Sequence, residues 1–370
     1  PVASYPGTLS EERLPMDSIT QAALGAAVGG AVLGRRLGRK AVLIGAVLGT
    51  LPDLDVMIDY GDAVANVTEH RGFSHSLFVL TGLGTLLALL TSRLGAAREI
   101  PLGHWWLFYV LCLTTHPLLD ALTTYGTQLL WPLDLPPVAY PIVFIIDPLY
   151  TLPLLVGIGV ALATGNGRRG PAWGLALSTA YLVFAFGAKQ LVEHRLEPML
   201  AERGLVDAPR LVQPTPFNTL LWRVTVVDGD DHHELLVGVL DGDTRPLVET
   251  YRRGAELEAA ALASERGARL DWFAGPFLRY ETRELDGQET LVATDLRLGF
   301  PGFHPFAFTL ATREGDDWRP VAVSEQPAAP SRGNREALAR LAGRALAPEP
   351  ALCTSDFVAA GWVQKAPEDC

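Results

Sequence analysis

Apolar residues dominate the first half of the chain, where they form six segments separated by short polar connections. These segments cover residues 19–34, 41–51, 73–92, 101–122, 142–164 and 172–192. The last four are about 20 residues long, which is enough for a helix to cross a bilayer, whereas 41–51 is short and is expected to be tilted or partly inserted. Glycines recur at short spacing in the first segment, which suits close helix packing in lipid. The pattern predicts a multi-helix transmembrane α domain of about six apolar segments, some of them re-entrant.

The second half of the chain instead contains short runs that are typical of strands, with turn signals between them. Pairs such as Asp-Gly predict the turns. The runs begin at about residues 220, 233, 276, 289, 306 and 317, and helical patterns occupy about residues 255–266 and 334–345. We predict a small soluble α+β domain with an antiparallel sheet. The expected division is a disordered extension at 1–15, the membrane domain at 16–192 and the soluble domain at 193–370.

Charge and composition separate the same two regions. The chain has 370 residues, 49% of them hydrophobic, and a mean hydropathy of +0.21, so it has room for two domains. Residues 1–192 hold 12 acidic and 11 basic side chains, whereas residues 193–370 hold 29 and 19. The net charge of −11 therefore lies almost entirely in the second half, which argues against nucleic acid as a partner.

The three cysteines are too few to build a disulfide scaffold. Cys112 lies in an apolar segment. Cys353 and Cys370 can pair if that end of the chain faces an oxidising compartment. The sequence leaves open whether they do.

Basic residues of the first half lie mainly in alternate connections between the apolar segments. With six crossings, the first, third and fifth connections share one side, and the positive-inside rule makes that side cytoplasmic. The basic residues of these connections are Arg35, Arg36, Arg39, Lys40, Arg93, Arg98, Arg168 and Arg169. The other connections and residues 193–370 are then expected to face the periplasm or exterior.

Histidines and carboxylates gather at the ends of segments that this topology places on the outer side. Such groups persist at membrane depth mainly when they are paired, water-facing or bound to a cation. We therefore predict a metal site. Its candidate ligands are Asp53, Asp55, His70, His75, His116 and Asp120. Imidazole and carboxylate ligands suit zinc or another divalent transition metal, and we expect one to three ions.

Some of these candidate ligands can instead have purely structural roles. His116 and Asp120 are four residues apart, so on a helix they can share a metal ion or only form a hydrogen bond. His75 can be a ligand or can cap the next helix with Ser76. The aspartates that follow Pro52 can be ligands or a solvated acidic turn. Convergence of the whole set on one side favours the metal site.

Four residues are candidates for catalysis. A hydrolytic site needs a carboxylate as general base, and Asp53, Asp55 or Asp120 can supply it. Arg71 can bind an anionic group such as a phosphate, because its guanidinium matches phosphate geometry.

The motifs around these residues resemble a known bacterial family. GTLPDLDV, HRGFSHSL and HPLLDALTTYGTQLLWP resemble the YdjM-like inner-membrane proteins, described as LexA-binding, inner-membrane-associated and predicted metal-dependent hydrolases. The resemblance covers about residues 16–192. It implies a membrane-embedded hydrolase of the bacterial inner membrane, with metal ligands at the six positions named above. The HxxxD pattern is more loosely similar to that of zinc phospholipase C.

We therefore expect a membrane-integral, zinc-dependent hydrolase that acts on a lipid or lipid-linked substrate at the outer face, at a phosphoester. The same ligands also fit a lipid amidase. Two non-enzymatic alternatives are a metal or proton transporter and a scaffold whose function resides in the outer domain. The apolar segments carry few ionisable residues beyond their outer ends, which disfavours transport. The substrate, the number of metal ions and the oligomeric state stay open.

Overall fold

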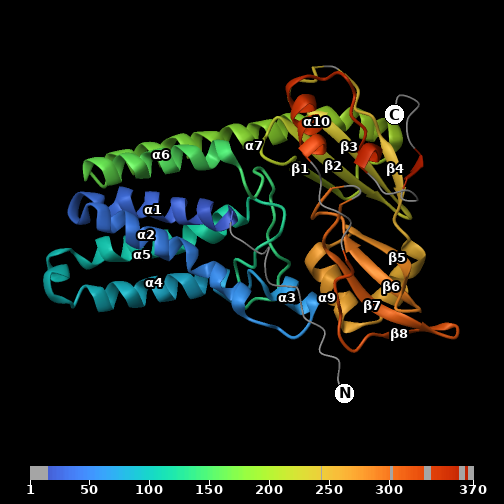
Figure 1. The fold of residues 1–370 in the computed structure, drawn as a ribbon, viewed down its shortest axis with the longest axis horizontal. Coiled ribbons are helices and arrows are strands. Elements are labelled where there is room, and N and C mark those ends of the chain that lie inside the picture. Colours follow the sequence, from blue (N-terminus) through green and yellow to red (C-terminus); the bar gives the residue numbers. More distant parts are fainter. Residues whose placement is uncertain (1–15, 243, 301–302, 329–334, 358–362, 366–370) are drawn as a thin grey trace.

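The structure is a computed structural model that describes residues 16–242, 244–300, 303–328, 335–357 and 363–365. A helical part at residues 16–203 lies beside a sheet part at residues 210–365 (Figure 1). The extension at residues 1–15, which we expected to be disordered, lies outside the described residues.

The helical part consists of helices joined by short 3₁₀ turns. In chain order these are α1 (Met16–Leu37), α2 (Arg39–Thr50), η1 (Pro52–Met57), α3 (Ala63–Glu69), η2 (Phe73–His75), α4 (Leu77–Thr91), η3 (Gly95–Glu99), α5 (Leu102–Asp120), α6 (Pro148–Thr164) and α7 (Arg169–Arg203). α1 packs in the middle, against α2, α5, α6 and α7 (Figure 1). Each of the predicted apolar segments overlaps one of the helices α1, α2, α4, α5, α6 and α7.

Glycine lets α1 and α2 approach each other closely. A Cβ on Gly25 would lie 2.3 Å from the carbonyl oxygen of Gly45, and a Cβ on Gly49 would lie 2.5 Å from that of Gln21. Both neighbours are rigid backbone atoms in a close-packed interior, so a larger side chain would force the helices apart. This contact holds the end of α2 beside the first turns of α1.

The prediction of about six membrane-spanning segments is wrong. Among the described residues, α7 is the one single helix that is long and apolar enough to cross a membrane, and α3 to α4 adds a second if that bent pair counts as one span. α2, α4 and α6 have 12, 15 and 17 residues, so they are about 18–26 Å long, less than the about 30 Å of a bilayer core. α1 and α5 have 22 and 19 residues but are not apolar enough over that length. An apolar segment in this sequence therefore predicts a helix, but not a crossing.

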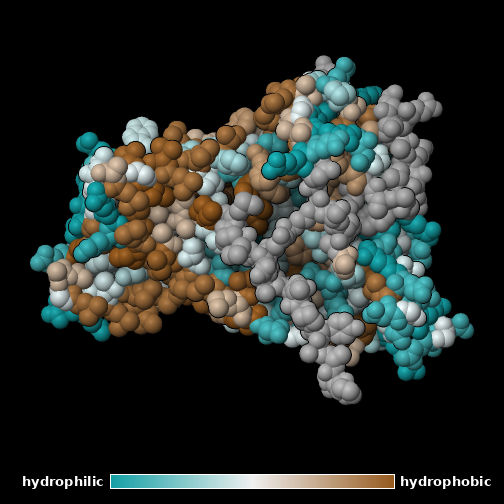
Figure 2. Space-filling model, in the orientation of Figure 1, coloured by the Kyte–Doolittle hydropathy of each residue, from teal (hydrophilic) through white to brown (hydrophobic). Residues whose placement is uncertain are grey.

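Apolar side chains nevertheless cover much of the outside of the helical part. Figure 2 shows this hydrophobic surface over the helices and a more hydrophilic surface over the sheet part. Large apolar side chains that are exposed include Leu43, Val47, Phe78, Val156 and Val183. A soluble protein rarely exposes so large a contiguous apolar surface, so this surface is suited to contact with lipid.

α7 joins the two parts as one continuous helix. Its first half lies along α6 (Figure 1). In its second half, the buried Val192 and Leu196 pack in one hydrophobic cluster with Trp222 and Val224 of the sheet part. The helix therefore runs through Glu193, where the sequence pattern places the start of the soluble domain, and fixes the sheet part to the helices.

The sheet part holds two antiparallel sheets rather than the single sheet that we predicted. One has the strand order β1-β2-β3-β4-β9 and the other β5-β6-β7-β8. The strands are β1 (Arg210–Pro214), β2 (Leu221–Asp228), β3 (Asp231–Gly238), β4 (Glu249–Arg252), β5 (Leu278–Leu285), β6 (Gln288–Asp295), β7 (Ala307–Glu314), β8 (Asp317–Pro320) and β9 (Val363–Lys365). The β2–β3 hairpin pairs Asp228 with Asp231 across a turn in which Gly229 has a φ of 58°.

All of the runs that we predicted as strands are strands, namely β2, β3 and β5 to β8. The sequence analysis missed β1, β4 and β9, which have five, four and three residues and are too short to show alternation. The remaining elements are η4 (Ala255–Leu257), α8 (Glu258–Leu262), α9 (Glu265–Ala274), α10 (Arg335–Leu346) and η5 (Thr354–Phe357). The helix predicted at 255–266 is divided because Ser264 caps a new helix, α9, with a hydrogen bond from Gly267 N–H.

The sheet part contacts the helical part through α3 and α9 (Figure 1). Arg269 of α9 donates a hydrogen bond of 2.7 Å to Glu69 and one of 3.2 Å to Thr68. Arg266 pairs with Asp62, which caps α3. α3, which lies in the polar stretch between α2 and α4, is therefore held against the sheet part.

Candidate metal centre

The polar stretch between α2 and α4 folds into short turns around the end of α5. α2 ends at Thr50, and Pro52, which lacks the N–H that continues a helix, begins the 3₁₀ turn η1 with its two aspartates. η2 carries His75. His116 and Asp120 lie one turn apart in the last turns of α5. Residues distant in sequence thus reach one end of the helical part.

Four of the six predicted ligands converge. Asp53, His75, His116 and Asp120 each offer a ligand atom, and these atoms all lie within 4.8 Å of one another. Asp120 Oδ2 is 3.2 Å from His75 Nε2 and 3.3 Å from His116 Nε2. Asp53 Oδ1 is 3.2 Å from His116 Nε2 and 3.5 Å from His75 Nε2. Two carboxylate oxygens and two imidazole nitrogens therefore face a common centre.

Hydrogen bonds to the other ring nitrogens orient both histidines. His116 Nδ1 lies 2.5 Å from the carbonyl oxygen of Gly49, which can only accept, so Nδ1 carries the proton. The Ser74 hydroxyl donates to Asp55, at 2.6 Å, and is 2.8 Å from His75 Nδ1, so it accepts a hydrogen bond from that nitrogen. When both rings are neutral, these contacts keep the proton on Nδ1, so both Nε2 atoms present a lone pair to the centre.

The atoms that face the centre are not used in hydrogen bonds. His75 Nε2, His116 Nε2 and Asp120 Oδ2 are buried, and none of them makes a hydrogen bond with a described residue. A buried polar atom without a hydrogen-bond partner costs about 1–3 kcal/mol, and one bound cation would satisfy all three atoms. Two imidazoles and two carboxylates form a donor set that zinc accepts, so the residues fit a divalent cation.

Asp55 and His70, the other two predicted ligands, lie beside this group and bond to each other. His70 Nδ1 is 2.9 Å from Asp55 Oδ1. Asp55 Oδ2 accepts from the backbone N–H of Arg71, at 3.0 Å, and from the Ser74 hydroxyl. Asp55 thus has partners on both oxygens and holds Ser74 in place, which in turn orients His75.

Arg71 and Gln21 contact Asp120 from two directions. The amide of Gln21 donates a hydrogen bond of 2.7 Å to Asp120 Oδ1, which leaves Oδ2 directed at the centre. Arg71 Nε is 3.4 Å from Asp120 Oδ2, and its guanidinium carbon is 5.1 Å from the centroid of the Tyr125 ring. Arg71 is buried and has a φ of 62°, a strained conformation for a residue with a side chain. Strain of this kind is often retained at functional sites.

The carboxylates make the centre favourable for positive charge. Burial alone would raise the pKa of Asp53, but contacts with His116 and His75 hold it well below its usual range. Burial alone would lower the pKa of His116, but Asp120 and Asp53 raise it to about 10. Asp53 is the most exposed of the four side chains, at 18%, and the other three are buried. Solvent therefore reaches the centre from the side of Asp53.

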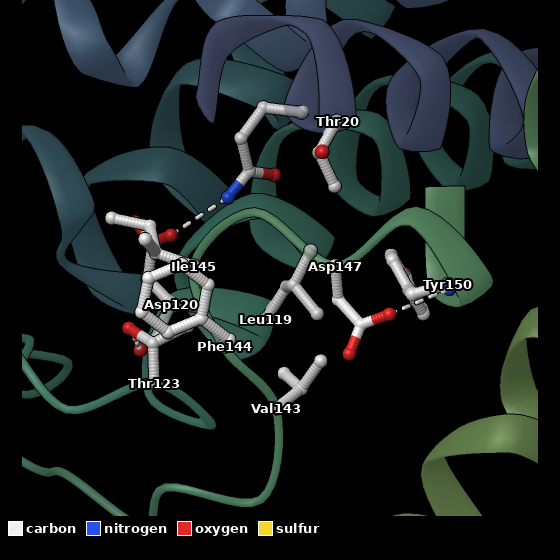
Figure 3. A pocket seen from close by; sticks show the side chains of 10 residues that line it. Thr20, Leu119, Asp120, Thr123, Val143, Phe144, Ile145, Asp147 and Tyr150 are labelled. Carbon is white, nitrogen blue, oxygen red and sulfur yellow. Dashed lines mark hydrogen bonds between the residues drawn. The ribbon is translucent and has the colours of Figure 1, made fainter. Parts of the chain in front are cut away.

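A small cavity borders Asp120 on its far side. Figure 3 shows Asp120 and Asp147 around this cavity, which has a volume of about 10 Å³ and therefore room for about one water molecule. Asp147 caps α6, because its Oδ1 accepts from the backbone N–H of Leu149 at 2.9 Å. Asp147 is therefore a helix cap rather than a member of the cluster.

The centre and the basic connections lie at opposite ends of the helical part. Arg39 donates a hydrogen bond of 3.3 Å to the carbonyl oxygen of Ala163, so the α1–α2 and α6–α7 connections adjoin each other. The α4–α5 connection lies at the same end (Figure 1). In the sheet part, Cys353 is disulfide-bonded, and Cys370, the partner considered from the sequence, lies outside the described residues.

Sequence reasoning missed the groups that orient the ligands. Gln21 could have been found as a lone amide in a helix of small apolar residues, since a buried amide needs a partner. Ser74 stands in the quoted HRGFSHSL motif but was given no role. The Gly49 carbonyl has no sequence signal, because every residue has a carbonyl group.

Comparisons with known proteins place the helical part in a family. Residues 16–192 match the family described as YdjM inner membrane protein. The inner membrane protein YbcI of Escherichia coli (strain K12) is 36% identical over 120 residues, which is 31% of this chain and 66% of YbcI, slightly under two thirds of its length. The uncharacterized protein YfhP of Bacillus subtilis (strain 168) is 22% identical over 272 residues, 72% of this chain and 80% of YfhP. No solved structure matches significantly.

Proposed function

Residues 16–192 belong to the YdjM inner membrane protein family, and from this premise and the buried His/Asp centre we propose that the chain is a membrane-bound, zinc-dependent hydrolase. Its substrate is a lipid or lipid-linked molecule, and the bond is a phosphoester. One observation carries the proposal: three buried ligand atoms face one centre without a hydrogen-bond partner among the described residues, and Asp53 completes the group.

Each residue has a role in this proposal. His75, His116 and Asp120 would hold one zinc ion, which would supply Lewis acidity toward the scissile group and activate a water at its open fourth position. The Asp53 carboxylate, at the solvent-accessible edge, takes the proton of the attacking water. Arg71 places a positive charge beside the centre, where it favours an anionic phosphoester.

The surroundings of the centre support a lipid substrate. The apolar surface of the helical part adjoins the end at which the centre lies, so a lipid can reach it without leaving the membrane (Figure 2). α7 is long and apolar enough to cross a membrane, and the basic residues at its start favour the cytoplasmic side by the positive-inside rule, which directs its other end and the sheet part to the periplasm. The disulfide at Cys353 agrees with an oxidising compartment on that side.

The first test measures metal content. Detergent-purified full chain should contain about one equivalent of zinc by mass spectrometry of metals, and His116→Ala and His75→Ala should each lose most of it. His104→Ala is the matched control, since His104 is an exposed histidine on the same helix, α5, and should keep the metal. Thermal unfolding of each variant checks that the fold survives. Zinc absent from the folded wild type after reconstitution would refute the proposal.

The second test addresses the reaction. Zinc-loaded protein is incubated with a phospholipid, a lipid phosphate and an N-acyl lipid, and the products are identified by mass spectrometry. Hydrolysis at phosphorus is expected, and Asp53→Asn should lower its rate by about 100-fold or more, while the exposed Asp59→Asn should not. Release of a fatty acid from the N-acyl lipid alone would instead assign the amidase reaction. Turnover that is unchanged in Asp53→Asn would refute the role of Asp53.

A further inference from the structure

An apolar groove runs between α6 and α7 on the outer surface of the helical part. Its volume is about 600 Å³, within the range of about 300–1,000 Å³ that is usual for ligand sites. Its walls are exposed: Leu152 on α6 is 53% accessible, Val156 on α6 64%, and Trp173 on α7 71%. The described residues thus leave a large hydrophobic hollow unfilled.

Glycines shape the floor of this groove. A Cβ on Gly157 would lie 2.4 Å from the carbonyl oxygen of Gly170, and one on Gly174 would lie 2.6 Å from that of Pro153. α6 and α7 therefore touch along their backbones, and the larger side chains stand on either side of the contact. Close glycine packing alone would explain only the helix contact. The apolar volume above it is open and large enough to hold a ligand.

The length of the groove matches one leaflet of a membrane. Along α6 it extends from Leu149 to Val160, which at 1.5 Å per residue is about 17 Å. Half of a bilayer's hydrocarbon core is about 15 Å. An extended acyl chain from a single leaflet would therefore fill the groove from end to end.

Charge marks the end at which a lipid headgroup would lie. Arg169, the first residue of α7, lines the groove, is exposed and makes no ion pair with a described residue. Trp173 stands one helical turn further along, and tryptophan is enriched at the level of lipid headgroups. Arg169 also lies at the end of the helical part that carries the basic connections. This end therefore complements an anionic headgroup.

We propose that the α6–α7 groove binds an anionic phospholipid, with one acyl chain in the groove and the phosphate on Arg169. The Arg169 end of the groove lies at the end of the helical part opposite the metal centre, and none of the four residues of the centre lines the groove. A second copy of the chain is the other occupant to consider. The groove is lined by 11 residues, whereas a stable protein interface uses about 20–30 residues on each side. The groove alone is too small for such an interface.

Native mass spectrometry of the detergent-solubilised full chain tests this proposal. The probes are phosphatidylglycerol and phosphatidylcholine with identical acyl chains. Wild type should bind one phosphatidylglycerol more tightly than phosphatidylcholine, and Arg169→Gln should weaken phosphatidylglycerol binding by about fivefold, as expected for one basic residue near an anionic lipid. Arg36→Gln is the control, because Arg36 is exposed at the same end but does not line the groove. It should bind like wild type.

A second pair of variants tests the groove itself. Val156→Trp fills the groove and should reduce binding of both lipids. Val183→Trp is the matched control, since Val183 is 68% exposed on α7 outside the groove, and should leave binding unchanged. Both positions are exposed, so the fold should survive, and thermal unfolding checks this. The proposal is overturned if Arg169→Gln and Arg36→Gln behave alike, or if Val156→Trp binds lipid like wild type. It is also overturned if Val156→Trp instead abolishes a dimer.

Discussion

Replacement of Ser74 by alanine isolates the effect of ligand orientation on metal affinity. The Ser74 hydroxyl is the acceptor for His75 Nδ1, at 2.8 Å, and the donor to Asp55, at 2.6 Å. Alanine removes both contacts without touching an atom that faces the centre. The nearest remaining acceptor for His75 Nδ1 is Asp55 Oδ2, 3.8 Å away, which is too far for a hydrogen bond.

Two magnitudes follow from this geometry. Groups that hydrogen-bond a metal-ligating histidine typically change metal affinity by about 10–100-fold, which is about 1.4–2.7 kcal/mol. The buried N–H left without an acceptor should also destabilise the fold by about 1–3 kcal/mol. Because His75 is 0% exposed, water cannot easily replace the lost partner. We therefore expect a loss of zinc affinity near the upper end of the range.

Zinc affinity is measured by competition with a chromophoric chelator, and stability by thermal unfolding with and without zinc. Ser76→Ala is the matched control: its hydroxyl accepts from Val79 N–H at the start of α4 and donates to the Trp131 carbonyl, so it stabilises the fold without contacting a ligand. Ser76→Ala should cost stability and leave zinc affinity within twofold of wild type. Equal zinc affinity in Ser74→Ala and wild type would refute the orientation argument.

Two further predictions concern the sheet part. Burial and nearby positive charge lower the pKa of His232, and they lower that of His304 to about 3. In the unfolded state a histidine has a pKa of about 6.5, so the unfolded state binds more protons than the folded state. The free energy of unfolding should therefore fall as the pH drops below about 6.5. The midpoint of urea unfolding should therefore decrease from pH 7 to pH 5. It should decrease less in the double variant His232→Phe/His304→Phe. An equal decrease in the double variant would contradict the claim that these two histidines cause the pH dependence. Arg223→Ala should destabilise the protein by about 3–5 kcal/mol in urea unfolding, because it leaves Glu234, which is 0% exposed, without its bidentate partner. The exposed Arg245→Ala should cost less than about 1 kcal/mol, and similar effects of the two substitutions would contradict this reasoning.

Local sequence patterns predicted most of the helices and strands, but not how the strands pair into sheets. The run at β2 alternates between apolar and polar residues from Trp222 to Val226, and a turn with Gly229 follows it, so this strand and its turn follow from the sequence. β3 does not alternate, and nearly all of its residues are buried. β1 and β9 are strands only because β2 and β4 lie beside them. The division into two sheets likewise depends on which strands pair over long separations, which alternation does not encode.

The membrane prediction failed for a related physical reason. A high hydropathy indicates that a segment is buried away from water. It does not show whether the segment is buried in lipid or in the interior of the protein. The Gly- and Ala-rich α1 satisfies that avoidance inside the bundle, where Ala27 is 0% exposed and Leu33 1%. α7 is different, because most of its apolar window is exposed: 28% of it is buried.

Sequence alone determined the residue types of the candidate centre and the family that its motifs resemble. Asp53, His75, His116 and Asp120 were all identifiable, since imidazoles and carboxylates at the ends of apolar helices need a partner or a cation. Tertiary structure decided which of the six candidates share a centre, because their atoms are brought together only when η1, η2 and α5 pack. It also separated Asp55 from the ligands, through contacts with His70, Ser74 and a backbone N–H that no spacing rule contains. Distances within a few ångströms depend on packing between distant segments, and that packing is a property of the whole fold.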